Sequence, residues 1–598
     1  MLLQILEHPS TLSEILSALI INAGNYAQLI WKLLCLPFIF IILCSTWLSQ
    51  SGRSNSLGSE KAFLLITALG LIILRYPSYA AGEINPDEGE WIAGAATLIR
   101  DPRFWISVDG TTSGPLNIFP LCVLYLFNIK ISFVTVRLFC IICFLIPAIY
   151  FTYFAIKNFY NQSVARLVIV PLILFFTLTS HFDLSFYSSE YVSVFLLAAV
   201  VYLYALFSNK PTYSRLIAAG LILGLLPYGK MQSLPVGMVV GLFFLVDIVF
   251  NKANTNWGKL KSVLILGVAA LLPTLFTFAY LYYFNAFNDF WQSYILNNVV
   301  YGSVVPLKRT LLALPKMVLS HTKSALPYYV AAAVIPVIGL YYLLTNRNQW
   351  SQLNLKWFLF FHLLFIAAYY AIGKGWGFPH YQLFIFLPLI LLNAFYLDLI
   401  KSFKPLNYSK LMLRIYVIMP LILLIPGNFL IQKVLADKAL PVRNPASTRI
   451  LQYAQPGDKL VVWGFQDILG SNGVYYLETG LTQGTRESHS QRPEGHIGDS
   501  AQVRYYQERF LSDIKKSQPV AIIDLGVIRY DAPSAYKAFY PALDQYIAAN
   551  YTLDTVFQRM QTEVGASGMS KLKVRPLSTA VYIHNDRLPK NQCNLWEK

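Results

Sequence analysis

The chain has 598 residues, of which 56% are hydrophobic and only 13% are charged. Soluble domains usually carry about 25% charged residues, so this composition excludes an ordinary soluble protein and indicates an integral membrane protein. The formal net charge is +17, but the basic residues lie mainly in short loops between apolar runs. Positive charge in such loops sets topology and meets anionic lipid. We therefore expect membrane lipids, and no nucleic acid, among the partners.

The apolar runs predict about twelve membrane spans, since each needs roughly 20 mostly apolar residues. We place them near 29–48, 61–80, 131–156, 167–182, 191–207, 216–229, 233–250, 260–284, 325–344, 357–373, 381–398 and 411–431. With these boundaries, alternate loops collect Lys and Arg on one side, which the positive-inside rule makes cytoplasmic. The apolar stretch Pro115–Phe127 is too short to span comfortably and is predicted to lie in the outer interface.

Two domains follow from this reading. Residues 1–431 are predicted to form a transmembrane helical bundle, with an outer loop at 81–130. Residues 432–598 are predicted to form a small extracytoplasmic α/β domain, because short β-branched runs at 459–463, 520–523 and 580–583 alternate with helical patterns. No Gly-rich phosphate loop appears in this tail.

The first outer loop contains the acidic run Asp87-Glu88-Gly89-Glu90, directly after Asn85-Pro86. One interpretation is a solvated acidic cluster that caps the helix beginning near Glu88. The other is a catalytic base at the membrane surface, facing a lipid-bound substrate. In the next outer loop Glu190 begins a span, so it is either a partner of the helix dipole or a second carboxylate facing the same cavity.

Basic residues near the outer ends of spans invite two readings as well. Lys230 lies in a break between two short apolar segments, and Arg137 lies near the outer end of its span. Each can extend its charged head to the interface or bind a phosphate group. The loop from Gly373 to Gln382 adds Lys374, Trp376, His380 and Tyr381. Gly and Pro are ordinary turn residues there, and Trp376 and Tyr381 suit an interfacial aromatic belt, but His380 with Lys374 would also suit a phosphate.

Taken in order along the chain, these motifs resemble the GT-C superfamily of membrane glycosyltransferases. More narrowly they resemble the protein O-mannosyltransferase and lipid A aminoarabinose transferase branch, often called glycosyltransferase family 39. The resemblance rests on Asp87-Glu88 followed by Gly114-Pro115-Leu116, on Glu190 at the start of a span, on a Gly-rich span ending in Lys230, and on His380-Tyr381 before a run containing Pro388. The tail phrase from Pro456-Gly457-Asp458 to Trp463-Gly464 is also similar. Members of the branch often have a basic residue or His before the Pro of the interfacial helix, where this chain has Ser113-Gly114.

The resemblance implies an inverting enzyme that moves a sugar from a polyprenyl-phosphate-linked donor to an acceptor hydroxyl on the outer face of the membrane. Asp87 would be the base, with Glu88 and Glu190 orienting the acceptor or tuning Asp87. Neutralisation of the departing phosphate is assigned to a set of basic residues: Lys230, His380, Arg103 and Arg137. Substrate binding is assigned to Tyr381, Trp376 and Asp109. The expected acceptor is a glycan, a lipid or a protein, and the expected location is a bacterial plasma membrane and cell envelope.

Two other functions stay open at this point. A polymerase or ligase of lipid-linked glycans would use a longer donor and often has a large outer loop rich in Arg, whereas the basic outer residues here are scattered. A transporter or flippase would place charges in mid-span and show two halves with related hydropathy. No certain cofactor is predicted; a divalent metal is compatible with the acidic loop but no ligand pattern indicates one.

Overall fold

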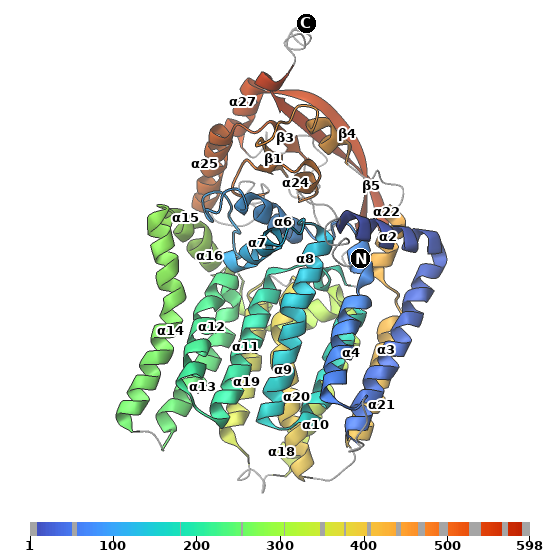
Figure 1. The fold of residues 1–598 in the computed structure, drawn as a ribbon, viewed down its shortest axis with the longest axis vertical. Helices are drawn as coiled ribbons and strands as arrows, with labels where there is room; N and C mark the ends of the chain where they lie inside the picture. Colours follow the sequence, from blue (N-terminus) through green and yellow to red (C-terminus); the bar gives the residue numbers. More distant parts are fainter. Residues whose placement is uncertain are drawn as a thin grey trace.

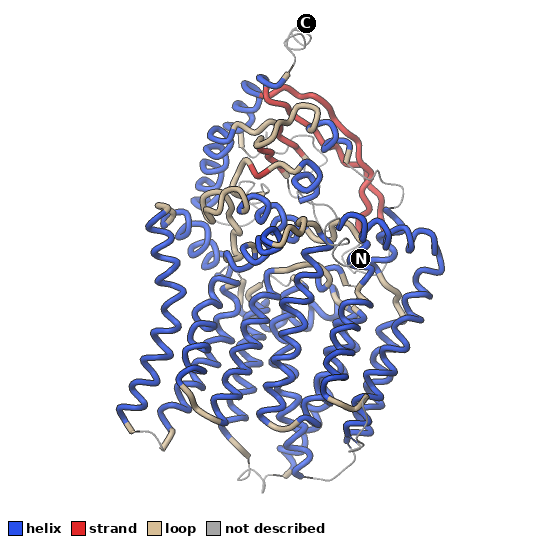
Figure 2. The backbone as a smooth tube through the Cα atoms, viewed as in Figure 1, coloured by secondary structure: helices blue, strands red, loops and turns tan. Residues whose placement is uncertain are grey.

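The computed structural model describes residues 9–50, 57–179, 181–252, 255–303, 305–346, 353–375, 378–403, 408–437, 444–464, 473–488, 500–525, 540–564 and 572–588. It confirms the predicted fold class: a bundle of long apolar helices with a small α/β domain at one end (Figures 1 and 2). Within these residues, ten helices are long and apolar enough to cross a membrane. The protein is therefore an integral, multi-pass membrane protein.

All twelve predicted spans coincide with helices. Two of them, α10 (Gln162–Leu178) and α12 (Tyr213–Gly229), are apolar but shorter than the other ten. The remaining bundle helices are α3 (Ala27–Gln50), α4 (Glu60–Ile73) with α5 (Tyr76–Ala80), α8 (Phe133–Cys140) continuing into α9 (Ile146–Phe159), α11 (Ser189–Asn209), α13 (Leu234–Phe250), α14 (Asn256–Tyr283), α18 (Leu326–Thr345), α19 (Leu355–Gly373), α20 (Leu383–Phe403) and α21 (Tyr408–Leu424).

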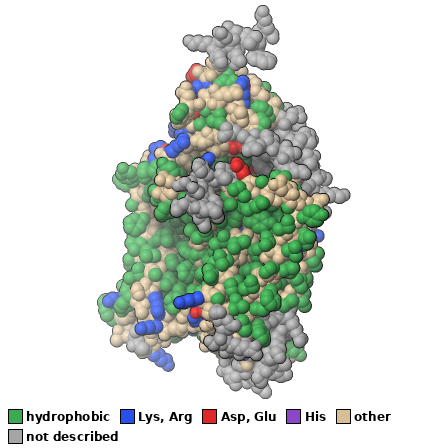
Figure 3. Space-filling view, turned by 45° about the vertical axis from the view of Figure 1, so that its right-hand side comes forward, with side chains coloured by type: hydrophobic (Ala, Val, Ile, Leu, Met, Phe, Trp, Pro, Cys, Tyr) green, Lys and Arg blue, Asp and Glu red, His purple; other side chains and the backbone are tan. Residues whose placement is uncertain are grey.

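Short helices cover the end of the bundle that faces the α/β domain (Figure 1). They are α2 (Pro9–Ala23), α6 (Pro86–Leu98), α7 (Phe119–Leu126), α15 (Phe287–Asp289), α16 (Asn297–Ser303), α17 (Leu307–Lys316) and α22 (Phe429–Asp437). The stretch predicted to lie in the interface becomes the short helix α7, which packs against α6 rather than crossing the bundle. On the face shown in the space-filling view, apolar side chains cover the bundle, and Lys and Arg side chains gather at the end away from the α/β domain (Figure 3).

The α/β domain contains one five-stranded sheet in the order β2-β1-β3-β5-β4. β1 (Lys459–Trp463) runs parallel to β2 (Thr482–Gln483) and β3 (Ala521–Asp524), while β5 (Leu572–His584) runs antiparallel to β3 and β4 (Tyr551–Val564). Its helices are α23 (Pro445–Ile450), α24 (Gly473–Thr479), α25 (Ser500–Ser517) and α27 (Pro541–Asn550). The sequence located β1, β3 and the end of β5 but missed β4, because polar residues interrupt the apolar positions of that strand. The exact domain division at residues 431 and 432 stays a prediction.

Side chains alternate across the sheet, so each of its faces builds its own core. Val461 and Trp463 face α25 and α27, together with Phe510 and Leu543. Leu460 and Val462 face the opposite way, into a cluster that also contains Ala93 of α6. One face of the soluble sheet therefore rests directly on the helix that carries Asp87.

Candidate active site

The helix α6 begins at the acidic run because local sequence specifies a helix start there. Asn85 has an extended backbone, its side chain accepts a hydrogen bond from the Asp87 amide, and Pro86 follows at the first helical position. Asp87 and Glu88 thus occupy the first turn, where carboxylates interact favourably with the helix dipole. The acidic residues therefore lie at the helix start as the capping interpretation expected, but the cap is Asn85 and the run is not solvated, since Glu88 and Glu90 are buried.

Asp87 and Glu88 point in different directions, since neighbouring side chains on a helix diverge by about 100°. Glu88 is fully buried, whereas Asp87 is half-buried. The charged groups that interact with Asp87 are His380, Glu90, Lys230 and Glu190. Burial raises the pKa of the Asp87 carboxyl, His380 opposes this shift, and Glu90 adds to it. Asp87 therefore belongs to a shared cluster of charges gathered from four segments of the chain.

Lys230 lies at the carboxyl end of α12, with its side chain buried. Its Nζ is 2.5 Å from Oε1 of Glu190, donates to Oγ of Ser189 at 2.8 Å, and lies 4.8 Å from the centre of the Tyr381 ring. The second carboxylate oxygen of Glu190 is buried without a hydrogen-bond partner among the described residues. This ion pair is incomplete, so it can engage an additional group.

His380 enters the same cluster from the loop between α19 and α20. It lies in the short 3₁₀ helix Pro379–Gln382 and is buried. Its Nδ1 is 3.8 Å from Oδ1 of Asp183, and that oxygen accepts a hydrogen bond of 2.8 Å from the side chain of Asn85. The start of α6 is thereby linked through Asp183 to the imidazole.

A second buried ion pair, between Glu88 and Arg137, has a different character. Arg137 Nε donates to Glu88 at 2.9 and 3.1 Å, and its two terminal nitrogens reach Glu88 and the carbonyls of Ser78, Ala81 and Gly82. Glu88 also accepts from the Tyr187 amide at 3.0 Å. The sequence assigned Glu88 to catalysis and Arg137 to the donor phosphate; in the structure the two side chains pair with each other at the turn between α5 and α6, and their assigned roles stay predictions.

Of three further residues predicted for the site, two lie apart from the cluster and one lies outside the residues that the structure describes. Arg103 is 47% exposed and pairs with Asp101 at 2.6 Å, while Asp109 is buried against Arg509 at the same distance. Asp109 therefore faces the α/β domain instead of a substrate, because the loop carrying it folds upward against that domain. Trp376 lies outside the described residues. Tyr381, in contrast, is in the cluster beneath Lys230, and its hydroxyl is 3.2 Å from that of Tyr301.

Sequence reasoning missed Asn85, Asp183 and Ser189 as members of this site. Asn85 before Pro86 carried a capping signal, and Ser189 directly precedes Glu190, so both had a visible local cue. Asp183 had none, since a carboxylate in a short loop gives no indication of the imidazole that it will meet 197 positions later. Among the described residues, no group of three or more His, Cys, Asp or Glu is arranged to hold a metal ion.

A basic cavity of about 360 Å³ lies beside the site. It is lined by Lys308, Arg309, Lys316 and His321, with apolar residues between them. The backbone carbonyl of His321 is 3.1 Å from Nε2 of His181, two residues before Asp183. Residues 290–397 contain no Asp or Glu, so the segment that lines this cavity supplies no carboxylate to balance its basic side chains.

No protein-family model and no curated protein matches the sequence. Among solved structures, the chain resembles ArnT from Cupriavidus metallidurans in the apo state, with 13% identity, a TM-score of 0.46, and coverage of 88% of this chain and 98% of that one. It also resembles the Archaeoglobus fulgidus oligosaccharyltransferase AglB in complex with an inhibitory peptide and a dolichol-phosphate, with 11% identity, a TM-score of 0.41, and coverage of 77% and 69%. At such identities and TM-scores the likeness assigns no activity to this chain.

Proposed function

We propose that this protein is an inverting glycosyltransferase that moves a sugar from a polyprenyl-phosphate-linked donor to an acceptor hydroxyl. The observation that carries the proposal is the buried cluster in which the Asp87 carboxylate shares a site with two cationic or ionisable groups, Lys230 and His380. The cluster lies where membrane helices meet the surface layer, which is where the headgroup of a lipid donor would sit.

In this mechanism Asp87 is the general base. The acceptor oxygen forms a bond to the anomeric carbon of the sugar as the bond from that carbon to the phosphate oxygen breaks. The acceptor proton passes to Asp87, and both bonding electrons leave with the lipid phosphate. Because the phosphate is already a good leaving group, one carboxylate is enough for the chemistry, in contrast to the pair used in glycosidases.

Lys230 and His380 are the groups proposed to stabilise the departing phosphate. The ammonium of Lys230 has three donors, and two acceptors are present in the structure, Glu190 and Ser189. The third donor is available to a phosphate oxygen, while Glu190 orients the ammonium. The neighbouring basic cavity supports the same interpretation, since Lys308, Arg309 and Lys316 would attract an anionic headgroup toward the site.

The experiment that tests the proposal is mass spectrometry of lipid copurified with the protein, followed by a transfer assay with the lipid found. We expect a polyprenyl phosphate or its sugar conjugate. Recovery of ordinary phospholipid alone, together with no binding of added polyprenyl phosphate, would contradict the proposed donor class.

The active site is proposed to face the extracytoplasmic side. Basic residues border the helix ends on the side of the bundle opposite the α/β domain, among them Lys61, Lys157, Arg166, Lys210, Arg215 and Lys356, and the positive-inside rule places that end in the cytoplasm. Reporter fusions after residue 598 should therefore show an extracytoplasmic carboxyl terminus. A cytoplasmic signal would reverse the assigned face and leave the site geometry unchanged.

A further inference from the structure

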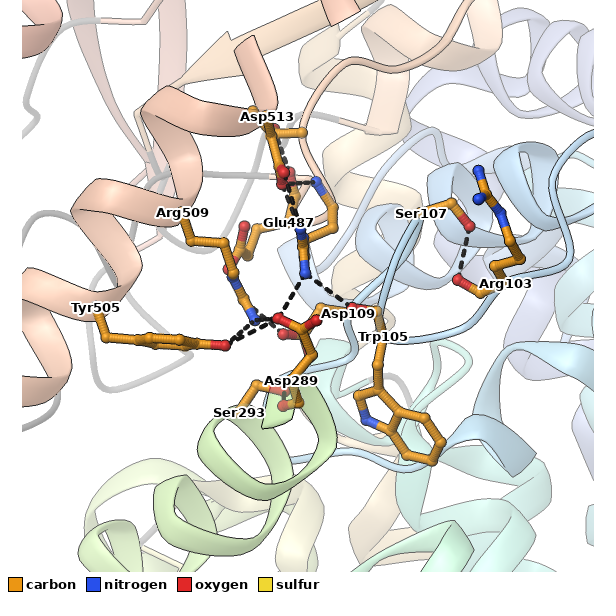
Figure 4. Close-up of polar contacts among 12 residues, drawn as sticks. Arg103, Trp105, Ser107, Asp109, Asp289, Ser293, Glu487, Tyr505, Arg509 and Asp513 are labelled. Atoms are coloured by element: carbon orange, nitrogen blue, oxygen red, sulfur yellow. Dashed lines mark hydrogen bonds and ion pairs between the residues drawn. The ribbon is translucent and has the colours of Figure 1, made fainter. Parts of the chain in front are cut away.

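A buried cluster of charges joins the α/β domain to the membrane domain (Figure 4). Arg509 of α25 pairs with Asp109 at 2.6 Å and also contacts Glu487. Arg486 pairs with Asp289 of α15 at 2.7 Å and with Asp513 at 2.9 Å. The cluster thus ties three separate segments together: the loop after α6, the helix α15 and the α/β domain.

Burial of these charges is costly, so stability alone does not account for them. The side chains of Arg509 and Asp109 are 5% and 0% exposed, and desolvation of such a pair often cancels its Coulomb attraction. Buried ion pairs are well attested as devices that fix one arrangement of elements over others. The Arg509–Asp109 pair is placed to fix how the loop after α6 lies against the α/β domain.

The segment that follows Asp109 leads directly to Lys230. The Asp109 carboxylate accepts a hydrogen bond from the backbone amide of Thr111. Thr111 has φ of 52°, a left-handed conformation that is unfavourable for a β-branched residue. Ser113 then pairs with Lys230 as an isolated β-bridge, and the Gly114 amide donates to the Gly229 carbonyl at 2.9 Å. A Cβ on Gly114 would stand 2.1 Å from the Tyr228 carbonyl oxygen, so this approach requires glycine.

The α/β domain also packs closely against α6. A Cβ on Gly473 of α24 would stand 2.4 Å from the Cα of Gly89, which follows Glu88. The Gln483 amide of β2 donates to Oγ1 of Thr97 at 3.2 Å, and Ala93 belongs to the core of the sheet. The α/β domain therefore contacts both halves of the site: the helix of Asp87 from above, and the Lys230 corner through the 109–114 segment.

We propose that Arg509 is a positioning residue of the active site: through Asp109 and the turn at Thr111 it fixes the backbone at Lys230, and so sets Lys230 against Asp87. The consequence for donor binding rests on the proposed function, whereas the consequence for the backbone at Lys230 does not. The α/β domain is then a structural part of the catalytic site rather than an appendage.

The test uses the full-length protein in detergent or nanodiscs, with Arg509→Gln as the main variant. Arg509→Lys keeps the charge without the planar fork, so its changes in exchange and binding should be smaller than those of Arg509→Gln. It also keeps the test informative if Arg509→Gln folds poorly. The matched control is Arg449→Gln, because Arg449 forms a 2.7 Å pair with Asp554 inside the same domain and away from the 109–114 segment.

The first readout is hydrogen exchange, which needs no donor. Arg509→Gln should speed exchange of the amides of Thr111 and Gly114 and of peptides covering Tyr228–Lys230, while Arg449→Gln should leave them at the wild-type rate. Unchanged exchange in Arg509→Gln would overturn the positioning role, whatever the protein is found to bind.

The second readout is binding of polyprenyl phosphate. Arg509→Gln should weaken it about tenfold, and the double variant with Lys230→Ala should bind only as weakly as Lys230→Ala alone, because both changes remove the same contact. Arg449→Gln should leave the Kd unchanged. Fully additive losses in the double variant would overturn action through Lys230. Absence of binding by the wild-type protein would count against the proposed donor, and the exchange result would still decide the positioning role.

Discussion

Two buried ion pairs flank the start of α6, and they are built in opposite ways. In the Arg137–Glu88 pair the guanidinium makes a fork with the carboxylate and its remaining donors reach three backbone carbonyls. In the Lys230–Glu190 pair the ammonium makes one short contact with a carboxylate whose other oxygen is left without a hydrogen-bond partner in the described part of the chain.

The difference assigns different work to the two pairs. Arginine offers five donors in a fixed plane, which suits a permanent joint between segments. Lysine is a compact charge on a flexible stem, and it can turn toward an incoming phosphate without breaking several bonds. On the proposed function, we assign the Arg137–Glu88 pair to the scaffold and the Lys230–Glu190 pair to the reactive site. Substitutions in and around the two pairs test this division, from the largest expected effect to the smallest.

Asp87→Asn should have the largest effect on activity. The amide keeps the size of the side chain but cannot accept a proton, and general base catalysis contributes roughly a hundred- to ten-thousand-fold. We expect sugar transfer to fall by at least about a hundredfold, measured as initial rate with a polyprenyl-phosphate sugar. Binding of the donor should persist, because the charge that is lost has the same sign as the phosphate.

Glu190→Gln is the companion variant to Asp87→Asn, since it removes the carboxylate that pairs with Lys230 in the same cluster. If Asp87→Asn transfers sugar normally and Glu190→Gln abolishes transfer, the base is misassigned although the enzyme class stands. Normal transfer by both variants would contradict a carboxylate base altogether.

Glu88→Gln should show its effect on folding. It leaves the guanidinium of Arg137 buried with its charge unbalanced, and loss of one partner of a buried pair typically costs about 3–5 kcal/mol. We expect a loss of this order in the free energy of unfolding, measured by denaturation in mixed micelles. Glu190→Gln should cost less, because the Lys230 ammonium retains Ser189 and the Tyr381 ring as neighbours. Equal losses would remove the distinction between scaffold and site.

Lys230→Ala should weaken donor binding; since it also leaves Glu190 buried without its partner, binding is measured on protein shown to be folded. A charge-assisted hydrogen bond is worth about 1.5–3 kcal/mol, so the Kd for polyprenyl phosphate should rise by a factor that corresponds to this range. His380→Ala should act in the same direction. Lys374→Ala is the matched control, because the Lys374 ammonium donates to the Val305 carbonyl at 2.9 Å in the same outer layer. A change of Kd in the control alone would place the phosphate elsewhere.

Much of the bundle was predictable from sequence, because apolar length and loop charge are local properties. The spans at 29–48 and 260–284 correspond to α3 and α14, and the short stretch Pro115–Phe127 was correctly kept out of the count. The strand β4 was missed, since its polar residues interrupt the apolar pattern and it is stabilised by pairing with β5 far along the chain.

The site was predictable only in part, and the reason is pairing at long range. Asp87, Glu190, Lys230 and His380 stand out because each charge interrupts or borders an apolar run. Whether a charge faces a neighbour or a cavity depends on partners that sequence does not display. Arg137 and Lys230 allowed the same two interpretations in sequence. In the structure Arg137 is buried against Glu88, whereas Lys230 pairs with one oxygen of Glu190. Asp109 likewise gave no sign of Arg509, 400 residues away.

The smallest expected effect is a shift in pH dependence caused by Glu90. Burial raises the pKa of Asp87, His380 and Lys230 lower it, and Glu90 and Glu190 raise it. Asp87 serves as base only when ionised, so transfer should fall as pH drops through its raised pKa, above the pH expected for an exposed aspartate. Since a raised pKa also means that ionised Asp87 destabilises the fold as pH rises through that value, Asp87→Asn should not reduce stability near neutral pH.

Glu90→Gln removes one negative neighbour and should move the acid limb of the rate profile to lower pH. The measurement is transfer rate against pH for the wild type and Glu90→Gln; an unmoved limb would show that a group other than Asp87 controls it.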